Sequence, residues 1–386
     1  MDAASGDVGP RITFLVSSPD ATGGIARSVS NLANHLVETH PVQILGLRRR
    51  DEPGYAFDPR IGVQCVTDDS GMLASKLDRM PSRLGNTARR QGHSALTDRL
   101  LPRTLRRLEP GVLVSTRPLL QVAAAQYAPE HTAVVGQDHF NFQFRHSGET
   151  FQHVAQAMDN TAALVVLTEA DAADYRQALP AAADKITVIR NAAPWPRREA
   201  ATSPQPVVLA AGSLVGRKGF DRLIEAFAPI AQTHPVWRLR ILGEGPDKVA
   251  LRRLAADLGV RGSVSIEGRS TQMQTAFAEA SVFALTSRLE GLPMVVIEAL
   301  TCGVPVVSFD CPRGPRELVV DGVNGRLVPD GDIAGLTSAL LALIDDPAER
   351  GRMAAGAVNS AGQYQPASVV TQWTQLFERV YAAAAA

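Results

Sequence analysis

Short apolar runs alternate with segments of helical spacing along most of this chain. After residue 206 the alternation is regular, and an amphipathic segment separates consecutive apolar runs. Parallel strands need a long crossover connection, usually a helix, whereas a tight hairpin joins antiparallel neighbours. Strands that alternate with helices are therefore expected to lie parallel in one sheet. The pattern therefore predicts a doubly wound α/β domain. Its strands are expected at 207–211, 237–242, 264–266, 282–285, 304–308 and 325–328, and its helices at 221–233, 248–258, 271–280, 295–301 and 333–344.

The first half of the chain repeats this rhythm less regularly. A length of 386 residues favours two domains over one. The segment 190–206 is rich in Pro, Arg and small residues, which predicts an interdomain linker. The expected division is a looser first domain over 1–189, a second over 207–365 and a final helix over 366–386. Strands of the first domain are expected at 12–17, 42–47, 112–115, 133–136, 162–167 and 186–189, with a helix at 25–38.

The charge balance and the cysteines limit the function classes. Lys and Arg total 39, as do Asp and Glu, so the excess of cations typical of nucleic-acid binding is missing. Cys65, Cys302 and Cys311 lack a metal-ligand spacing, which favours reduced thiols in a cytoplasmic protein. No apolar stretch is long enough for a membrane span, and residues 1–10 lack the core of a signal peptide. Any membrane contact is therefore expected to be peripheral.

A glycine-rich turn with two adjacent cations follows the strand at 207–211 directly. Glycines such as Gly212 let the backbone approach an anion, and Arg217 and Lys218 neutralise it. A strand, a loop and a helix N-terminus in this order form a common phosphate site. The segment predicts a pyrophosphate site, and the alternative is a solvated turn.

Two carboxylates, Glu290 and Glu298, flank a Gly-Leu-Pro loop at the start of an apolar helix. Pro293 suits the first turn of that helix, because its φ is fixed and it has no N–H. The free amides around it would face an anion, which the helix dipole favours. The apolar neighbours of Glu298 predict a partly buried carboxylate that needs a partner. The alternative is a salt-bridged residue on the surface.

Three weaker signals follow expected strand ends. Gly243 opens a Gly-Glu-Gly-Pro sequence, which we interpret as a sharp turn near a ligand. Gly23 and Gly24 precede the first helix and either approach a phosphate or form an ordinary turn. His139 lies in a polar cluster after a buried strand, where a role in a site and a structural role compete.

The only Asp-x-Asp pattern, Asp330 with Asp332, is of a kind that chelates a divalent metal in some sugar transferases. Asp332 comes directly before a helical pattern, so we interpret it as an N-cap. We therefore predict no metal site.

Residues 76–107 hold nine Lys or Arg and two Asp. Four of the cations, Arg99, Arg103, Arg106 and Arg107, have helical spacing. The segment is either a solvated basic face or a contact with an anionic lipid or an anionic acceptor.

These motifs together resemble those of the retaining glycosyltransferases of family four, which have the GT-B fold of two Rossmann-like domains facing across a cleft. The best match is the Glu-x7-Glu motif from Glu290 to Glu298 with its internal Gly-Leu-Pro. Residues 24–27, Gly-Ile-Ala-Arg, match the family's first-domain loop. Residues 309–317 resemble a subgroup that uses UDP-sugars on lipid-linked or cell-envelope acceptors.

The resemblance implies a metal-independent, retaining hexosyltransferase without a cofactor, since the UDP-sugar donor is a substrate. The first domain would bind a glycan, lipid-linked or small-molecule acceptor. The expected location is the cytoplasm, with any peripheral membrane contact at the inner face. The last helix would cross back to that domain. Catalytic roles would fall on His139, Arg217, Lys218 and Glu290, with the two cations on the diphosphate. Donor-binding roles would fall on Gly23, Gly24, Gly212, Gly243, Gly268, Arg269, Gly291, Leu292, Pro293, Met294 and, at the ribose, Glu298.

Two other functions fit the same motifs. A sugar-nucleotide 2-epimerase on this fold would need further acid and base groups, which the sequence does not place. A non-catalytic sugar-nucleotide sensor or scaffold would tolerate decay of the motif, yet Arg217, Lys218, Glu290 and Glu298 are all present. Release of nucleotide only in the presence of an acceptor would separate transfer from both.

Overall fold

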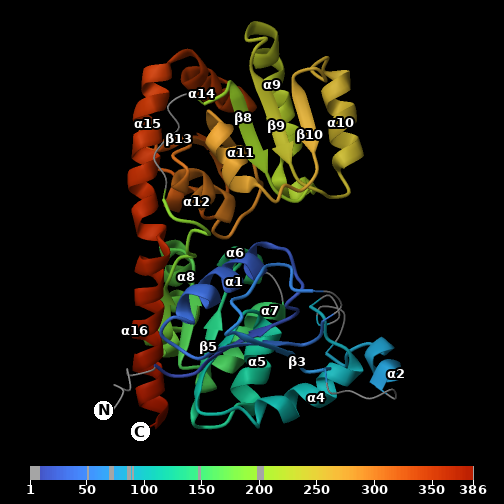
Figure 1. Ribbon diagram of the computed structural model, residues 1–386, viewed down its shortest axis with the longest axis vertical. Helices are drawn as coiled ribbons and strands as arrows, with labels where there is room; N and C mark the ends of the chain where they lie inside the picture. Colours follow the sequence, from blue (N-terminus) through green and yellow to red (C-terminus); the bar gives the residue numbers. More distant parts are fainter. Residues whose placement is uncertain are drawn as a thin grey trace. The chain divides into compact units, whose positions relative to one another are not determined.

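The computed structural model describes residues 9–49, 52–68, 74–84, 88, 91–146, 149–197 and 204–385. The chain forms two compact units, each built around one parallel sheet (Figure 1). One unit combines Met1–Pro194 with Pro366–Ala386, and the other is Trp195–Gln365. The predicted fold class, two Rossmann-like α/β domains, is confirmed.

The first unit contains a seven-stranded parallel sheet in the order β3-β2-β1-β4-β5-β6-β7. Helices cover both faces, so its central strands are buried throughout, as β1 shows with five buried residues. The sheet has one strand more than the sheet of the second unit. Its strands are β1 Ile12–Val16, β2 Val42–Gly46, β3 Gly62–Cys65, β4 Gly111–Ser115, β5 Thr132–Gln137, β6 Ala163–Val166 and β7 Ile186–Val188.

Successive residues of β1 point into the cores on opposite faces of this sheet. Phe14 packs in the core that also contains Trp373 and Phe377 of the last helix, while Leu15 packs with Leu105 on the other face. This alternation follows from the two-residue period of a strand. The helices are α1 Gly24–Leu36, α2 Ala74–Arg79, α4 Ala95–Leu105, α5 Pro118–Tyr127, α6 Phe142–His146, α7 Glu149–Ala157, α8 Glu169–Ala178 and α16 Pro366–Ala385.

The boundary between the units lies between Pro194 and Trp195, inside the predicted linker 190–206. Ala192 is 4% exposed in the first unit's core, and the Trp195 ring lies 6.4 Å from that of Phe277 in the second unit. The described start of this segment, 190–197, therefore includes residues packed within each unit.

The second unit contains a six-stranded parallel sheet in the order β10-β9-β8-β11-β12-β13. Every strand predicted here is present, with shifts of one or two residues at its ends. Its strands are β8 Val207–Ala211, β9 Arg238–Leu242, β10 Val264–Glu267, β11 Val282–Leu285, β12 Val306–Asp310 and β13 Gly325–Pro329. Its helices are α9 Phe220–Thr233, α10 Lys248–Asp257, α11 Met273–Glu279, α12 Met294–Thr301, α13 Pro315–Leu318, α14 Ile333–Asp345 and α15 Pro347–Ser360.

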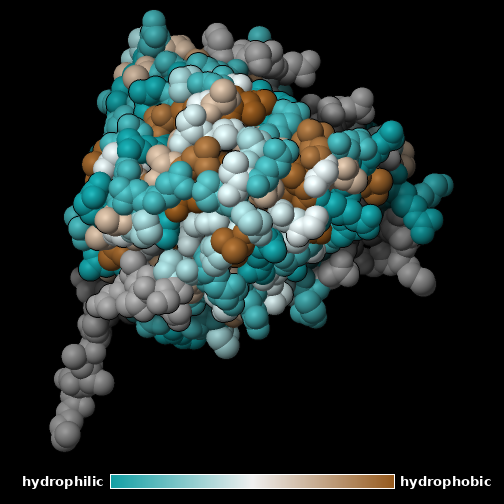
Figure 2. Space-filling model, turned by 90° about the horizontal axis from the view of Figure 1, so that it is seen from above, coloured by the Kyte–Doolittle hydropathy of each residue, from teal (hydrophilic) through white to brown (hydrophobic). Residues whose placement is uncertain are grey.

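The face seen in Figure 2 carries hydrophobic residues scattered among hydrophilic ones. Such single apolar residues are normal on a protein surface and mark no docking site by themselves. Among the described residues, no helix combines the length and the apolar character needed to cross a bilayer.

Candidate functional site

The second sheet reverses its winding between β8 and β11. From β8 the chain proceeds outward to β9 and β10, and it then returns to pair β11 with the other side of β8. The loops that follow β8 and β11 therefore run in opposite directions from the carboxyl edge of the sheet. Open α/β sheets bind ligands at such a point. The predicted pyrophosphate turn follows β8, and the Gly-Leu-Pro loop follows β11.

The turn that carries Arg217 and Lys218 is fixed against the loop after β11. Gly219 has a φ of 64°, and a Cβ atom on it would lie 2.0 Å from the carbonyl oxygen of Thr286. The amide of Arg288 donates to the carbonyl of Arg217 at 2.8 Å. Glycine is needed at position 219 for both its positive φ and this close approach. The two cations are thereby held at the edge of the sheet.

Glu290 is the centre of the cluster that results. Its Oε1 accepts from Lys218 Nζ at 2.5 Å and from Ser287 Oγ at 2.6 Å, and its Oε2 lies 3.5 Å from Arg217 Nη1. Glu290 is 7% exposed, and the side chain of Arg217 is 43% exposed. Two cations share one carboxylate here, so the cluster retains a positive charge for an anionic ligand. The solvated-turn alternative does not account for this arrangement.

Helix α12 presents its N-terminus beside this cluster. Pro293 is the N-cap residue and the helix begins at Met294, so the prediction that Pro293 lies in the first turn was off by one position. The amides of Leu292, Met294 and Val295 donate to no acceptor among the described residues. Unsatisfied amides and the helix dipole both favour an anion at this point.

Glu298 lies inside α12 and is 1% exposed. The prediction of a partly buried carboxylate understated its burial, and the alternative of a salt-bridged surface residue was wrong. A carboxylate this deep is costly unless it is hydrogen-bonded, which agrees with the predicted need for a partner.

The glycines of the β8 and β9 loops pack against each other. A Cβ atom on Gly243 would lie 1.9 Å from the carbonyl oxygen of Gly212, so neither loop tolerates a larger residue at 243 without moving. Gly268 lies next to Glu244, whose Oε1 would be 3.1 Å from a Cβ at 268. Arg269, the next residue, is exposed. These predicted donor-binding residues therefore share the carboxyl edge of one sheet.

The remaining predicted site residues belong to the first unit. Gly23 is the N-cap of α1 without a side-chain cap, and a Cβ on Gly23 or Gly24 would meet nothing within 4 Å. His139 follows β5 and is 9% exposed. Its neighbour Asp138 accepts from the hydroxyl of Tyr175 at 2.7 Å, which orders this polar cluster.

Three residues near Glu290 were missed by the sequence reasoning. Ser287 donates to Glu290, and Arg288 forms an ion pair with Asp221 at 2.6 Å, which lowers the pKa of Asp221 through its hydrogen bonds. Cys311 is buried, and burial followed by the charge of Glu290 raises the pKa of its thiol to about 12. The polar run directly after β11 was a signal for the first two, because such runs at strand ends often belong to sites.

The Asp-x-Asp pattern has no metal-binding arrangement. Asp332 caps α14 by accepting from the amide of Gly335 at 2.8 Å, as predicted, and Asp330 accepts from Arg222 at 2.8 Å. The described part of the chain contains no group of three His, Cys, Asp or Glu side chains that could hold a metal ion.

The basic segment 76–107 forms α2 and α4 in the first unit, while Arg89 and Arg90 lie outside the described residues. The helical prediction holds as far as Leu105: α4 buries its apolar side and leaves Arg99 and Arg103 exposed, while Arg106 and Arg107 are exposed directly after the helix. Arg106 lies 4.9 Å from the ring centre of Tyr127. The exposed set consists of Arg99, Arg103, Arg106 and Arg107.

Two family models match the chain one after the other. Residues 22–194 match the model for glycosyltransferase family 4, and residues 192–359 match the model for glycosyl transferases group 1. The change from one model to the other coincides with the boundary between the two units.

Two named proteins resemble the chain over most of its length. An exopolysaccharide phosphotransferase of Streptomyces coelicolor is 33% identical over 95% of this chain and 40% of that protein. The lipopolysaccharide core biosynthesis glycosyltransferase LpsD of Rhizobium meliloti is 28% identical over 72% of this chain and 78% of its own. The chain spans between 40% and 49% of the length of three curated relatives.

The fold matches solved structures at low identity. A structure of TarM has a TM-score of 0.80 and 16% identity, and the match covers 95% of this chain and 98% of that one. A TarM variant crystallised with fondaparinux, alpha-GlcNAc-glycerol and UDP has a TM-score of 0.78.

Proposed function

We propose that this chain transfers a sugar from a nucleotide-diphosphate donor to a hydroxyl group of an acceptor. Its two units match the models for glycosyltransferase family 4 and for glycosyl transferases group 1. The observation that carries this proposal is the cluster of Lys218, Arg217 and Glu290 beside the free amides of α12. Both cations and amides would bind the diphosphate, and Glu290 would orient Lys218 and receive a donor hydroxyl.

We propose UDP as the nucleotide. The support is the UDP bound in the TarM complex and the segment 309–317, which resembles the subgroup that uses UDP-sugars. This segment holds the backbone of Glu290 on both sides. The Glu290 amide donates to the carbonyl of Pro312 at 2.9 Å, and the Arg313 amide donates to the carbonyl of Glu290 at 3.0 Å.

The mechanism follows from the charges that develop during transfer. When the bond between the anomeric carbon and the phosphate oxygen breaks, the diphosphate gains negative charge, which Lys218, Arg217 and the helix amides stabilise. The acceptor oxygen would attack from the face that the phosphate leaves, and its proton would pass to a phosphate oxygen, so the configuration is retained. Cys311 would remain a protonated thiol, because its pKa is raised to about 12, and we assign no nucleophile.

We propose an anionic glycan or a lipid-linked cell-envelope glycan as the acceptor. Relatives named for exopolysaccharide and lipopolysaccharide core synthesis support this class. The exposed arginines in and directly after α4 would attract such an acceptor or the anionic membrane that holds it. His139 remains a proposed contact of the reacting sugar.

The test is a screen of UDP-, GDP- and ADP-sugars with the purified chain and glycan acceptors. We expect release of UDP that depends on the acceptor, with an α-configured donor giving an α-configured product by NMR. Inverted product would refute retention. Epimerised donor without transfer would support a 2-epimerase, and UDP binding without any turnover would support a sensor.

A further inference from the structure

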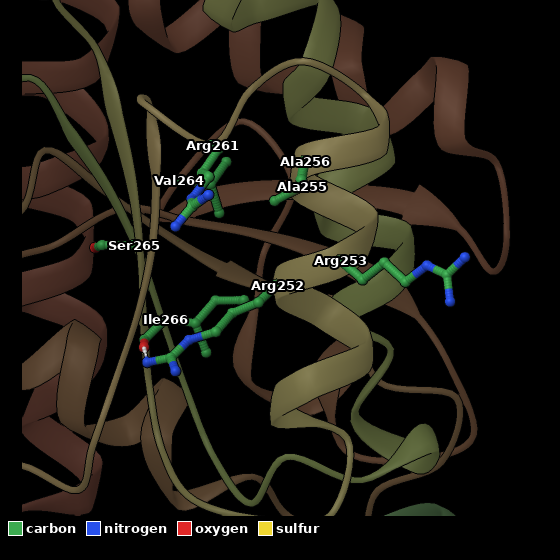
Figure 3. A pocket seen from close by; sticks show the side chains of 8 residues that line it. All are labelled: Arg252, Arg253, Ala255, Ala256, Arg261, Val264, Ser265 and Ile266. Carbon is green, nitrogen blue, oxygen red and sulfur yellow. Dashed lines mark hydrogen bonds between the residues drawn. The ribbon is translucent and has the colours of Figure 1, made fainter.

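The second unit contains a basic pocket at the opposite side of its sheet from β13. The cavity, about 570 Å³, lies between α10 and the edge strand β10 (Figure 3). None of Lys218, Glu290 or the α12 loop lines it. Its lining consists of Arg252, Arg253, Ala255, Ala256, Arg261, Val264, Ser265 and Ile266.

Two guanidinium groups of this pocket are not compensated by acids. Arg252 donates to the carbonyl of Ile266 at 3.0 Å, and neither it nor Arg261 pairs with a carboxylate among the described residues. In Figure 3 both side chains lie beside β10, whereas Arg253 extends away from them. Arg253 differs further, because its Nε lies 3.7 Å from Asp257 Oδ2.

The nearby acids are already engaged. Residues 248–269 contain five cations and two acids, a surplus of three positive charges in a chain of no net charge. One acid is Asp257, and the other, Glu267, accepts from Arg240 Nε at 3.0 Å. An anionic ligand would therefore find no competing carboxylate at Arg252 and Arg261.

We propose that this pocket binds a phosphate group carried by a glycan chain, outside the donor site. Guanidinium groups bind the oxygens of phosphate with paired hydrogen bonds. The hydroxyl of Ser265 is not available for this, because it donates to Glu267 Oε1 at 3.0 Å. The other walls are the apolar side chains of two alanines, Val264 and Ile266, which suit the apolar face of a sugar ring. No lining residue is aromatic, so a nucleobase would lack a stacking partner.

The proposal rests on the proposed function for its choice of a glycan. A pocket of this kind would hold the acceptor or product glycan at a second point besides the transfer site. Because both points would lie on one glycan chain, binding at the pocket would raise the concentration of that chain at the transfer site. The pocket itself is tested by binding, without any donor sugar, so its failure is separate from failure of transfer.

The experiment measures binding of a glycerol-phosphate oligomer to the full chain by calorimetry, with UDP present to occupy the donor site. The double variant Arg252→Gln/Arg261→Gln should bind the oligomer about tenfold more weakly, because it loses the charge-assisted bonds. The matched control Arg253→Gln should stay within about twofold, since that side chain points away. UDP affinity should be unchanged in all three proteins.

Four results would overturn the proposal. They are no oligomer binding by the unaltered chain, an equal loss in Arg253→Gln, equal affinity for inorganic phosphate, and equal affinity for an oligoglutamate peptide. The third would indicate a simple anion site and the fourth a protein-binding surface. Turnover with a neutral, short acceptor should be the same in the double variant, whatever the binding result.

Discussion

The backbone of Gly314 packs so closely on the loop after β11 that a Cβ atom at 314 would lie 1.9 Å from the carbonyl oxygen of Gly291. Gly314 also has a φ of 91°, a value that side chains strongly disfavour. The segment after β12 thereby supports the loop that carries Glu290. This contact joins two parts of the chain whose motifs looked independent in the sequence.

Gly314→Ala should therefore displace the Glu290 loop and weaken UDP binding, and it should destabilise the protein by about 1–3 kcal/mol. The matched control is Gly322→Ala, since Gly322 has a φ of 75° but a Cβ there would meet nothing within 4 Å. The control should lose about 1 kcal/mol for its backbone alone and bind UDP normally. Urea denaturation and calorimetry measure both effects, and equal UDP affinities would refute the supporting role of Gly314.

Lys218→Ala should reduce kcat/KM by the equivalent of about 2–4 kcal/mol, because the leaving diphosphate loses one charge-assisted contact. It also leaves Glu290 without its contact at 2.5 Å, so a Lys218→Arg variant should recover part of the rate. Arg253→Gln removes an exposed cation of the same unit and serves as the control. If Lys218→Ala kept its rate within about threefold, Lys218 would not belong to the diphosphate site.

Transfer should continue in EDTA, because the cations at 217 and 218 and the α12 amides would stabilise the leaving group. The measurement is initial rate with and without the chelator, after dialysis of the protein. Complete loss of rate, restored by Mn²⁺ or Mg²⁺, would contradict metal-independent transfer and the N-cap interpretation of Asp332.

The arginines in and directly after α4 should contribute to binding of anionic vesicles, at about 1 kcal/mol for each cation near the surface. Replacing Arg99, Arg103, Arg106 and Arg107 by Gln should weaken that binding and its dependence on salt, and leave UDP affinity unchanged. Replacing the same four by Lys keeps the charge and should preserve binding. The measurement is sedimentation with vesicles. Equal binding of the Gln and Lys variants, or no binding by the unaltered chain, would show that these arginines form only a solvated basic face.

The burial of His93 predicts that the free energy of unfolding falls at acidic pH. It is 2% exposed, and burial lowers the pKa of its imidazole, against a smaller opposite effect of Asp98. The neutral form is thus favoured in the folded state, so the unfolded chain binds more protons at low pH. The contribution of His93 to the free energy of unfolding is complete above its pKa in the unfolded chain, about 6.5. It is lost as the pH falls through the lower pKa of His93 in the folded protein.

The measurement for His93 is the urea midpoint at pH ~7.5 and ~5.5. His93→Gln should be less sensitive to this change than the unaltered chain, because it has no imidazole to protonate. His131→Gln, at an exposed position, is the control. An equal acid shift in all three proteins would show that other groups govern acid stability.

The strands of the second unit were predictable because each is a local pattern of buried residues, complete within a few positions. The N-cap at Asp332 was predictable for the same reason, since its bond to the Gly335 amide spans three residues. The edge strand β3 was missed because only Cys65 in it is buried, and an exposed strand carries little apolar signal.

The residue types of the site were also present in the sequence, but their partners were not. Lys218 and Glu290 are 72 positions apart, and only the winding of the sheet around β8 and β11 brings them to one edge. The same limit applies to the unit boundary at Pro194, the burial of Glu298 and the packing of Gly314 on Gly291. The sequence by itself determined the elements and the chemistry available, because these depend on neighbours along the chain. Tertiary structure decided which charges meet and which are left for a ligand, because that depends on contacts between residues far apart in the chain.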